Sequence, residues 1–107
     1  MSLDFYLTNV KPTEVFEINI THNLGRMAKE AGIYEALWRP DENKFVKARD
    51  IIAILISGLA DLKARPGHFQ QFNASNGWGL YEHFVPFVEK VLAACVENPD
   101  ADIDVSR

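Results

Sequence analysis

Two stretches near the N-terminus alternate apolar and polar residues with a period of two, which is typical of strands with one buried face. They span residues 4–10 and 15–21, and the segment Lys11-Pro12-Thr13 between them is typical of a turn. A connection this short predicts an antiparallel hairpin. The second stretch has the cleaner pattern, in which Phe16, Ile18 and Ile20 alternate with Glu17, Asn19 and Thr21.

Further along the chain, apolar residues recur with the period of an α-helix. Residues 23–32 carry one apolar stripe, formed by Leu24, Met27, Ala28 and Ala31. Residues 33–38 predict one or two further helical turns. The segment 51–64 predicts a longer helix with Asp50 as its N-cap. Its apolar residues cover more than one face, which predicts either a central helix or an apolar side that pairs with a second copy of the chain.

A last apolar stripe falls at residues 80–97, and Pro86 lies inside it. Proline lacks an amide proton and clashes with the preceding turn, so the residues allow either a kinked helix or a new helix that starts at Pro86. Residues 102–107 predict a short final strand. The order is β-β-α-α-α-β. We predict one α+β domain over residues 1–107, with three helices packed against one face of a three-stranded antiparallel sheet.

Composition and charge limit the possible partners and leave the predicted fold unchanged. The 107 residues carry a formal net charge of −4, which argues against a nucleic-acid partner held by a basic face. Four basic residues nevertheless lie within eleven positions, and they form either a local basic patch or a solvated loop and helix start: Arg39, Lys44, Lys47 and Arg49.

The single cysteine, Cys95, excludes an internal disulfide and suits a reducing compartment. Its apolar neighbours predict a buried, unreactive thiol. The longest apolar run, residues 51–56, is far shorter than the roughly 18 residues that cross a bilayer, so no membrane partner is expected. The N-terminus lacks the pattern of a signal peptide. We therefore expect a cytoplasmic protein.

No standard catalytic or cofactor-binding motif occurs, and we expect neither a catalytic residue set nor a cofactor. His22, His68 and His83 are too far apart in the sequence to predict one metal site. Two groups of polar and aromatic residues remain as candidates for a binding site.

The first group is Thr21-His22-Asn23, where the second strand meets the first helix. Such a junction gathers side chains and free helix amides at one edge, which suits a polar ligand. His22 could serve there as a general base or as a ligand contact. The alternative is that Thr21 and Asn23 only cap the helix, while His22 packs locally.

The second group surrounds Trp78, which has a glycine on either side, and it consists of Asn73, Asn76, Trp78 and Tyr81. The glycines allow a sharp turn that presents the indole, and an indole stacks on flat rings and on cations. The alternative is a loop with Trp78 folded onto the core. Trp38 and Arg39 would add an aromatic and cationic wall, although Trp38 also suits the core. We predict that the two groups meet at one edge of the sheet.

Several short motifs together resemble a family of small phage and prophage proteins. They are Ile20-Thr21-His22-Asn23-Leu24, Met27, Ala31-Gly32-Ile33-Tyr34, Asn76-Gly77-Trp78-Gly79-x-Tyr81, Ala94-Cys95 and Ile103-x-Val105-Ser106-Arg107. The resemblance covers nearly the whole chain. It implies a viral origin and the bacterial host cytoplasm as the working compartment, and it implies no particular reaction. The family more often has an aliphatic residue where this chain has Pro86, which bears on the continuity of the last helix.

Three functions from different classes follow as hypotheses. The first is a non-catalytic phage binding protein that sequesters a small polar, nucleotide-like ligand or a host protein, as a factor against host defence. The second is a small enzyme with His22 as general base. The third is a structural protein that forms a homo-oligomer through helix 51–64.

Overall fold

The sheet of this protein has three antiparallel strands, with the N-terminal strand in the middle. In the computed structural model, which describes residues 2–8 and 16–107, the strand order is β2-β1-β3. The strands are β1 (Ser2–Thr8), β2 (Phe16–Thr21) and β3 (Asp102–Ser106). Leu3 lies opposite Ile20 in β2, and Phe5 lies opposite Val105 in β3. The prediction that the C-terminal strand joins the first two is therefore confirmed.

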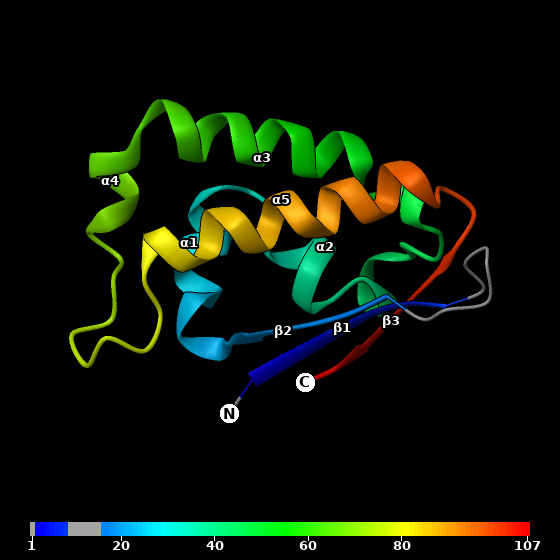
Figure 1. The fold of residues 1–107 in the computed structure, drawn as a ribbon, viewed down its shortest axis with the longest axis horizontal. Coiled ribbons are helices and arrows are strands. Elements are labelled where there is room, and N and C mark those ends of the chain that lie inside the picture. The colour runs from blue at the N-terminus through cyan, green and yellow to red at the C-terminus, as the bar shows by residue number, and fades with distance from the viewer. Residues whose placement is uncertain (1, 9–15) are drawn as a thin grey trace.

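The helices all cover the same face of this sheet (Figure 1), as predicted. The two long ones are α3 and α5, while α1 and α2 are drawn nearer the strands and α4 follows the end of α3. Their bounds are η1 (His22–Leu24), α1 (Gly25–Glu30), α2 (Tyr34–Trp38), η2 (Asp41–Asn43), η3 (Ala48–Asp50), α3 (Ile52–Ala64), α4 (Pro66–Gln70) and α5 (Tyr81–Glu97), where η marks a 3-10 helix. None of the helices in the described ranges combines the length and the apolar character needed to cross a membrane.

The core lies between β1 and the long helices. Every second residue of β1 is fully buried, namely Leu3, Phe5 and Leu7. The apolar stripe of α5 meets them with Phe84, Phe87, Val88, Val91 and Cys95. The alternation that predicted strands 4–10 and 15–21 is confirmed for residues 4–8 and 16–21, while residues 9–15 lie outside the described part of the chain.

The first helix begins differently from the prediction. Residues 22–24 form the 3-10 turn η1, and the α-helix begins only at Gly25. Thr21 is the N-cap of this turn, because its side-chain oxygen accepts the backbone N–H of Asn23 at 3.3 Å. The capping role predicted for Thr21 is therefore confirmed, but it closes a tighter turn than an α-helix.

Asp50 does not cap the long helix, so that prediction was wrong. Its carboxylate accepts the backbone N–H groups of Val46 and Lys47, at 3.0 and 2.9 Å. These bonds lower the pKa of the Asp50 carboxyl from its usual value. Helix α3 begins one residue later, at Ile52, without a side-chain cap. A short polar residue before an apolar run has the same sequence signature whether it caps the following helix or the preceding turn, and here the turn has the free amides.

Helix α5 runs unbroken through Pro86, from Tyr81 to Glu97. Pro86 is exposed. It lacks an amide proton, and the carbonyl of Glu82 therefore loses its intrahelical partner. Glu82 lies near the start of the helix and is also exposed. The neighbours on the buried side, Phe84, Phe87 and Val88, hold the helix in place on both sides of the proline. Of the two alternatives, a new helix at Pro86 is excluded.

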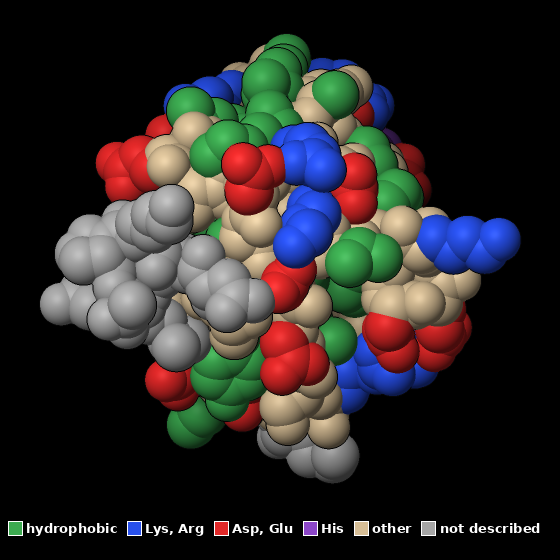
Figure 2. Space-filling model, turned by 90° about the vertical axis from the view of Figure 1, so that its right-hand side faces the viewer, with side chains coloured by type: hydrophobic (Ala, Val, Ile, Leu, Met, Phe, Trp, Pro, Cys, Tyr) green, Lys and Arg blue, Asp and Glu red, His purple; other side chains and the backbone are tan. Residues whose placement is uncertain are grey.

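Three of the four basic residues between positions 39 and 49 pair with acidic side chains and do not form a basic patch. Arg39 pairs with Glu42 at 2.9 Å, Lys47 pairs with Asp102, and Arg49 pairs with Asp100. Figure 2 faces the end of the molecule where α3 begins and α5 ends, and it shows acidic and basic side chains side by side. Surface pairs of this kind contribute little to stability. They neutralise the positive charge that binding of a polyanion would require.

Helix α3 has an apolar face on both its buried and its outer side, as predicted. Ile51, Leu55 and Leu62 have no exposed surface, whereas Ile56 is 52% exposed. Figure 2 shows hydrophobic side chains along the top of the molecule, where α3 lies. The homo-oligomer through this helix stays a prediction.

Gly58 fixes how closely α3 approaches the connection between α1 and α2. A Cβ atom at this position would lie 2.2 Å from Cγ2 of Ile33 and 3.1 Å from the carbonyl oxygen of Ala31. We expect Gly58→Ala to lower the free energy of unfolding by about 1–3 kcal/mol, because overpacking outweighs the better helix propensity of alanine.

The matched control for this prediction is Gly67→Ala in α4, where an added Cβ meets nothing within 4 Å. Its free energy of unfolding should be unchanged or rise by up to about 1 kcal/mol. Urea denaturation of both variants measures the difference. Equal stabilities would show that α3 does not need the close approach at Gly58.

Candidate functional site

The two predicted groups of residues meet at one edge of the sheet, as expected. Asn23, in the turn after β2, donates its side-chain N–H to the carbonyl oxygen of Trp78 at 2.6 Å. Gly79 packs against the same turn so closely that an added Cβ would lie 2.9 Å from Cβ of Asn23 and 3.5 Å from Cγ2 of Thr21. Gly79 is buried and has φ +129°, a conformation that side chains rarely adopt. The junction therefore depends on both Asn23 and Gly79.

The loop that carries Trp78 is held by its own hydrogen bonds. The backbone N–H of Trp78 donates to Oδ1 of Asn76 at 3.0 Å, and that of Ala74 donates to the carbonyl of Gly79 at 2.9 Å. With the bond from Asn23, both backbone polar groups of Trp78 are satisfied inside the protein. These bonds hold the backbone that carries the indole, while the ring itself is largely exposed.

Asn73 and Tyr81 anchor the ends of this loop and do not line the pocket. Oδ1 of Asn73 accepts the backbone N–H of Tyr81 at 2.7 Å, which satisfies the first amide of α5. The hydroxyl of Tyr81 donates to the carbonyl of Leu62, near the end of α3, at 2.8 Å. Both residues were predicted to contact a ligand, and the structure gives them a positioning role instead.

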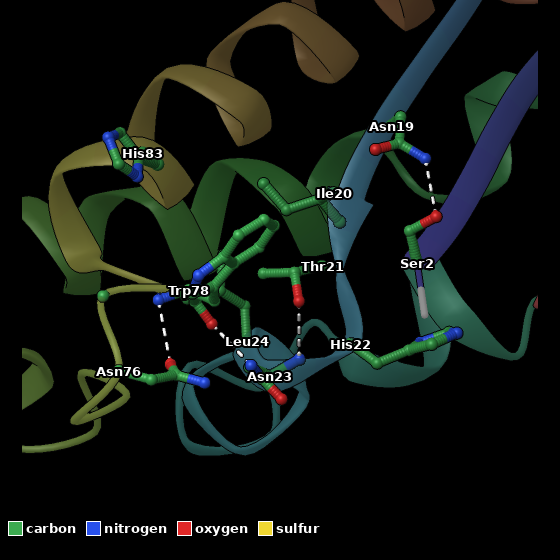
Figure 3. Close-up of a pocket in the computed structure, with 12 residues that line it drawn as sticks. Ser2, Asn19, Ile20, Thr21, His22, Asn23, Leu24, Asn76, Trp78 and His83 are labelled. Atoms are coloured by element: carbon green, nitrogen blue, oxygen red, sulfur yellow. Dashed lines mark hydrogen bonds between the residues drawn. The ribbon is translucent and has the colours of Figure 1, made fainter.

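An open groove of about 1040 Å³ lies between β2 and this loop. Figure 3 shows the indole of Trp78 standing between Ile20 and Thr21 on one side and His83 on the other. Five of the predicted site residues line the groove: Thr21, His22, Asn23, Asn76 and Trp78. Seven further lining residues were not predicted: Ser2, Asn19, Ile20, Leu24, Gly77, Gly79 and His83.

Two of the missed residues carried a usable signal. Asn19 lies two positions before Thr21 in β2, so the two side chains share one face of the strand. His83 lies in the first turn of the helix that follows the loop of Trp78. Ser2 had no such signal, because it reaches the groove only through its pairing with Thr21.

The two tryptophans have opposite environments. Trp78 is 71% exposed, so the alternative in which it folds onto the core was wrong. Trp38 is 2% exposed and stacks on Tyr34 with ring centroids 5.5 Å apart, as expected of a core residue. Arg39 pairs with Glu42 and does not line the groove. The aromatic and cationic wall of Trp38 and Arg39 is therefore not part of this site.

His22 connects the groove to the core. Its Nδ1 accepts the indole N–H of Trp38 at 2.8 Å, which satisfies the only polar atom of that buried ring. In a neutral imidazole one nitrogen accepts and the other carries the proton, so this bond puts the proton on Nε2. In this arrangement His22 offers a hydrogen-bond donor and no free lone pair.

Among the residues that line the groove, only the two histidines can carry a charge. Among its residues there is no Lys, Arg, Asp or Glu. One lining residue, Asn19, contacts a carboxylate outside the lining, because its side-chain N–H donates to Asp4 at 2.6 Å. Within residues 2–8 and 16–107, no three His, Cys, Asp or Glu side chains gather as a metal site would require. The groove offers an indole face and neutral hydrogen-bonding groups.

Cys95 is the only thiol, and it is fully buried in α5. Burial raises the pKa of this thiol to about 12. About one molecule in ten thousand would therefore carry the thiolate at pH 8. We expect the native protein to resist an aromatic disulfide reagent and to react with one equivalent once it is unfolded in guanidinium. Rapid reaction of the folded protein would contradict the burial of Cys95.

The closeness of Gly79 to Asn23 gives a second test at this site. Gly79→Ala should destabilise the protein more than Gly77→Ala, by at least about 1 kcal/mol, because only position 79 adds a steric clash to the unfavourable backbone. Gly77 also has a positive φ, of +78°, but an added Cβ there meets nothing within 4 Å. Thermal or urea unfolding of the two variants measures the difference. Equal losses would mean that the loop does not pack on the turn after β2.

Comparison of the chain with known protein families, curated proteins and solved structures gives no match. The resemblance to small phage and prophage proteins therefore stays a prediction. The geometry of the groove between β2 and the loop of Trp78 is therefore the basis for the proposed function.

Proposed function

We propose that this protein is a non-catalytic binding protein, which holds an uncharged ligand, or an uncharged part of a larger one, against Trp78 in the groove. The single observation that carries this proposal is the exposed indole on a backbone that is hydrogen-bonded at both its N–H and its C=O. A tryptophan side chain is among the largest apolar groups, and leaving it in water forgoes about 1.5–3 kcal/mol of burial. The loop nevertheless holds it there with hydrogen bonds on both sides of its backbone.

The chemistry of the groove supports binding in preference to catalysis. A general base needs a free lone pair near the proton that it removes. Nδ1 of His22 is occupied by the indole of Trp38, so His22 suits a donor role better than that of a base. The other histidine of the groove, His83, has no carboxylate among the lining residues to orient it as a base. The enzyme hypothesis is the weaker candidate for this reason.

The neutral lining also bears on which ligand the binding hypothesis favours, a nucleotide-like molecule or a host protein. Phosphate groups are recognised by Arg, Lys or helix N-termini. The groove has no Arg or Lys, and the first amide of α5, at its wall, already donates to Asn73. A nucleotide would bring two or more negative charges to a chain of net charge −4. A host protein can present an uncharged segment, so the groove favours the host-protein form. Within this proposal the protein acts in the cytoplasm of a phage-infected bacterium and blocks a component of host defence.

The proposal is tested by titration of the protein with uncharged and charged probes. We expect nucleosides and blocked neutral peptides to bind more tightly than the corresponding nucleoside monophosphates, as measured by calorimetry. Trp78→Ala should weaken any such binding about fivefold or more, because stacking on an aromatic ring contributes about 1–3 kcal/mol.

The control variant is Val96→Ala, which truncates another exposed apolar side chain on α5, away from the groove. Its affinities should equal those of the wild type. Two outcomes would contradict the proposal: tighter binding of the monophosphates than of the nucleosides, or binding that Trp78→Ala leaves unchanged.

A further inference from the structure

Strand β2 has an outer edge without a partner in the described part of the chain. In the order β2-β1-β3, β2 pairs with β1 alone, so about half of its backbone N–H and C=O groups point away from the sheet. The opposite edge of the sheet is different. There Lys47 forms a bridge with Asp102, and the backbone N–H of Ile103 donates to the carbonyl of Val46 at 2.9 Å. Within residues 2–8 and 16–107, no backbone bond of this kind covers β2.

The groove lies beside the last three residues of β2, at one end of this free edge. Its lining includes Asn19 and Thr21 from one face of the strand and Ile20 from the other, so the groove wraps around the edge and the end of β2. Figure 3 shows β1 with Ser2 on one side of β2 and Trp78 and His83 on the other. The far wall of the groove is therefore the loop of Trp78 and the first turn of α5.

We propose that an extended segment of a partner protein binds in this groove as a fourth strand of the sheet. This inference rests on the proposed binding function and names the ligand of the same site. A groove between an edge strand and a helix is the arrangement in which peptides add to a sheet, with backbone hydrogen bonds supplying affinity and side-chain contacts supplying specificity. Trp78 would supply such a side-chain contact, and hydrogen bonds hold its backbone at the wall of the groove.

The lining defines the chemistry of the segment. Successive side chains of an added strand point to opposite faces. One set would meet Ile20 and Trp78, which are apolar, and the other would meet Asn19 and Thr21, which are polar and uncharged. The segment should therefore alternate apolar and neutral polar residues. Strand β2 has six residues, so a segment of about four to six residues would match it.

A second copy of this chain is a less suitable occupant. Two copies of net charge −4 repel one another, and the β2 of a second copy would bring its exposed Glu17 to the interface. An uncharged segment of another protein meets neither difficulty.

The test begins with a displayed library of random eight-residue peptides, selected on the immobilised full chain. Enriched peptides should alternate apolar and neutral polar residues. Synthetic versions should bind the wild type and Val96→Ala equally, and Trp78→Ala about tenfold or more weakly, by fluorescence anisotropy. Circular dichroism of the variants confirms that each is folded.

Amide hydrogen exchange then separates strand addition from other modes of binding. With the peptide bound, alternate backbone amides of residues 16–21 should become protected, namely those that point away from β1. Protection of only the loop 73–79, with Trp78-dependent affinity, would overturn strand addition and leave the proposed binding function intact.

Two other outcomes also decide the inference. Strand addition would be overturned if the library yields no peptide that binds the wild type more tightly than Trp78→Ala. The titration with nucleosides then tests the binding function separately. A dimer by light scattering, in which the outward amides of β2 are protected without any peptide, would assign the edge to a second copy and overturn the proposed occupant.

Discussion

The burial of one face of β1 is the constraint on which the rest of the structure depends. Leu3, Phe5 and Leu7 have no exposed surface, and together they remove a large apolar area from water. Because β1 is also the central strand, it fixes the register of both neighbours. A slip of one residue would turn these three side chains to solvent, so the pairing is strongly specified.

The site follows from that arrangement through one further junction. Placing β1 in the centre leaves β2 at the edge, and α5 packs across the same face with the buried residues of its stripe. The start of α5 then brings the loop of Trp78 beside the end of β2, where Asn23 and Gly79 hold it. The groove is thus a consequence of how the core is packed, and several of its polar residues, such as Thr21, His22 and Asn23, also hold this part of the fold together.

Where sequence reasoning went wrong, the cause was competition between local hydrogen bonds. Asp50 had the position of an N-cap, but the free amides of Val46 and Lys47 were closer partners for its carboxylate. Asn73 and Tyr81 had the residue types of a binding site, and the loop uses them to close itself against α3 and α5. In each case the residue type indicated a hydrogen bond correctly, while the partner depended on which backbone groups the fold left unsatisfied.

The sequence by itself determined the strands and the main helices, their order and the faces that they bury, because a period of two or of 3.6 is a local property of the chain. The alternation of residues 16–21 and the apolar stripe of α5 are examples. It also identified Thr21–Asn23 and Asn76–Trp78 as unusual segments. Only the tertiary structure decided that Trp38 is buried while Trp78 is exposed, and that Ser2, Asn19 and His83 share one groove. These facts depend on contacts between residues far apart in the chain, and no local pattern encodes which distant backbone comes close enough to make them.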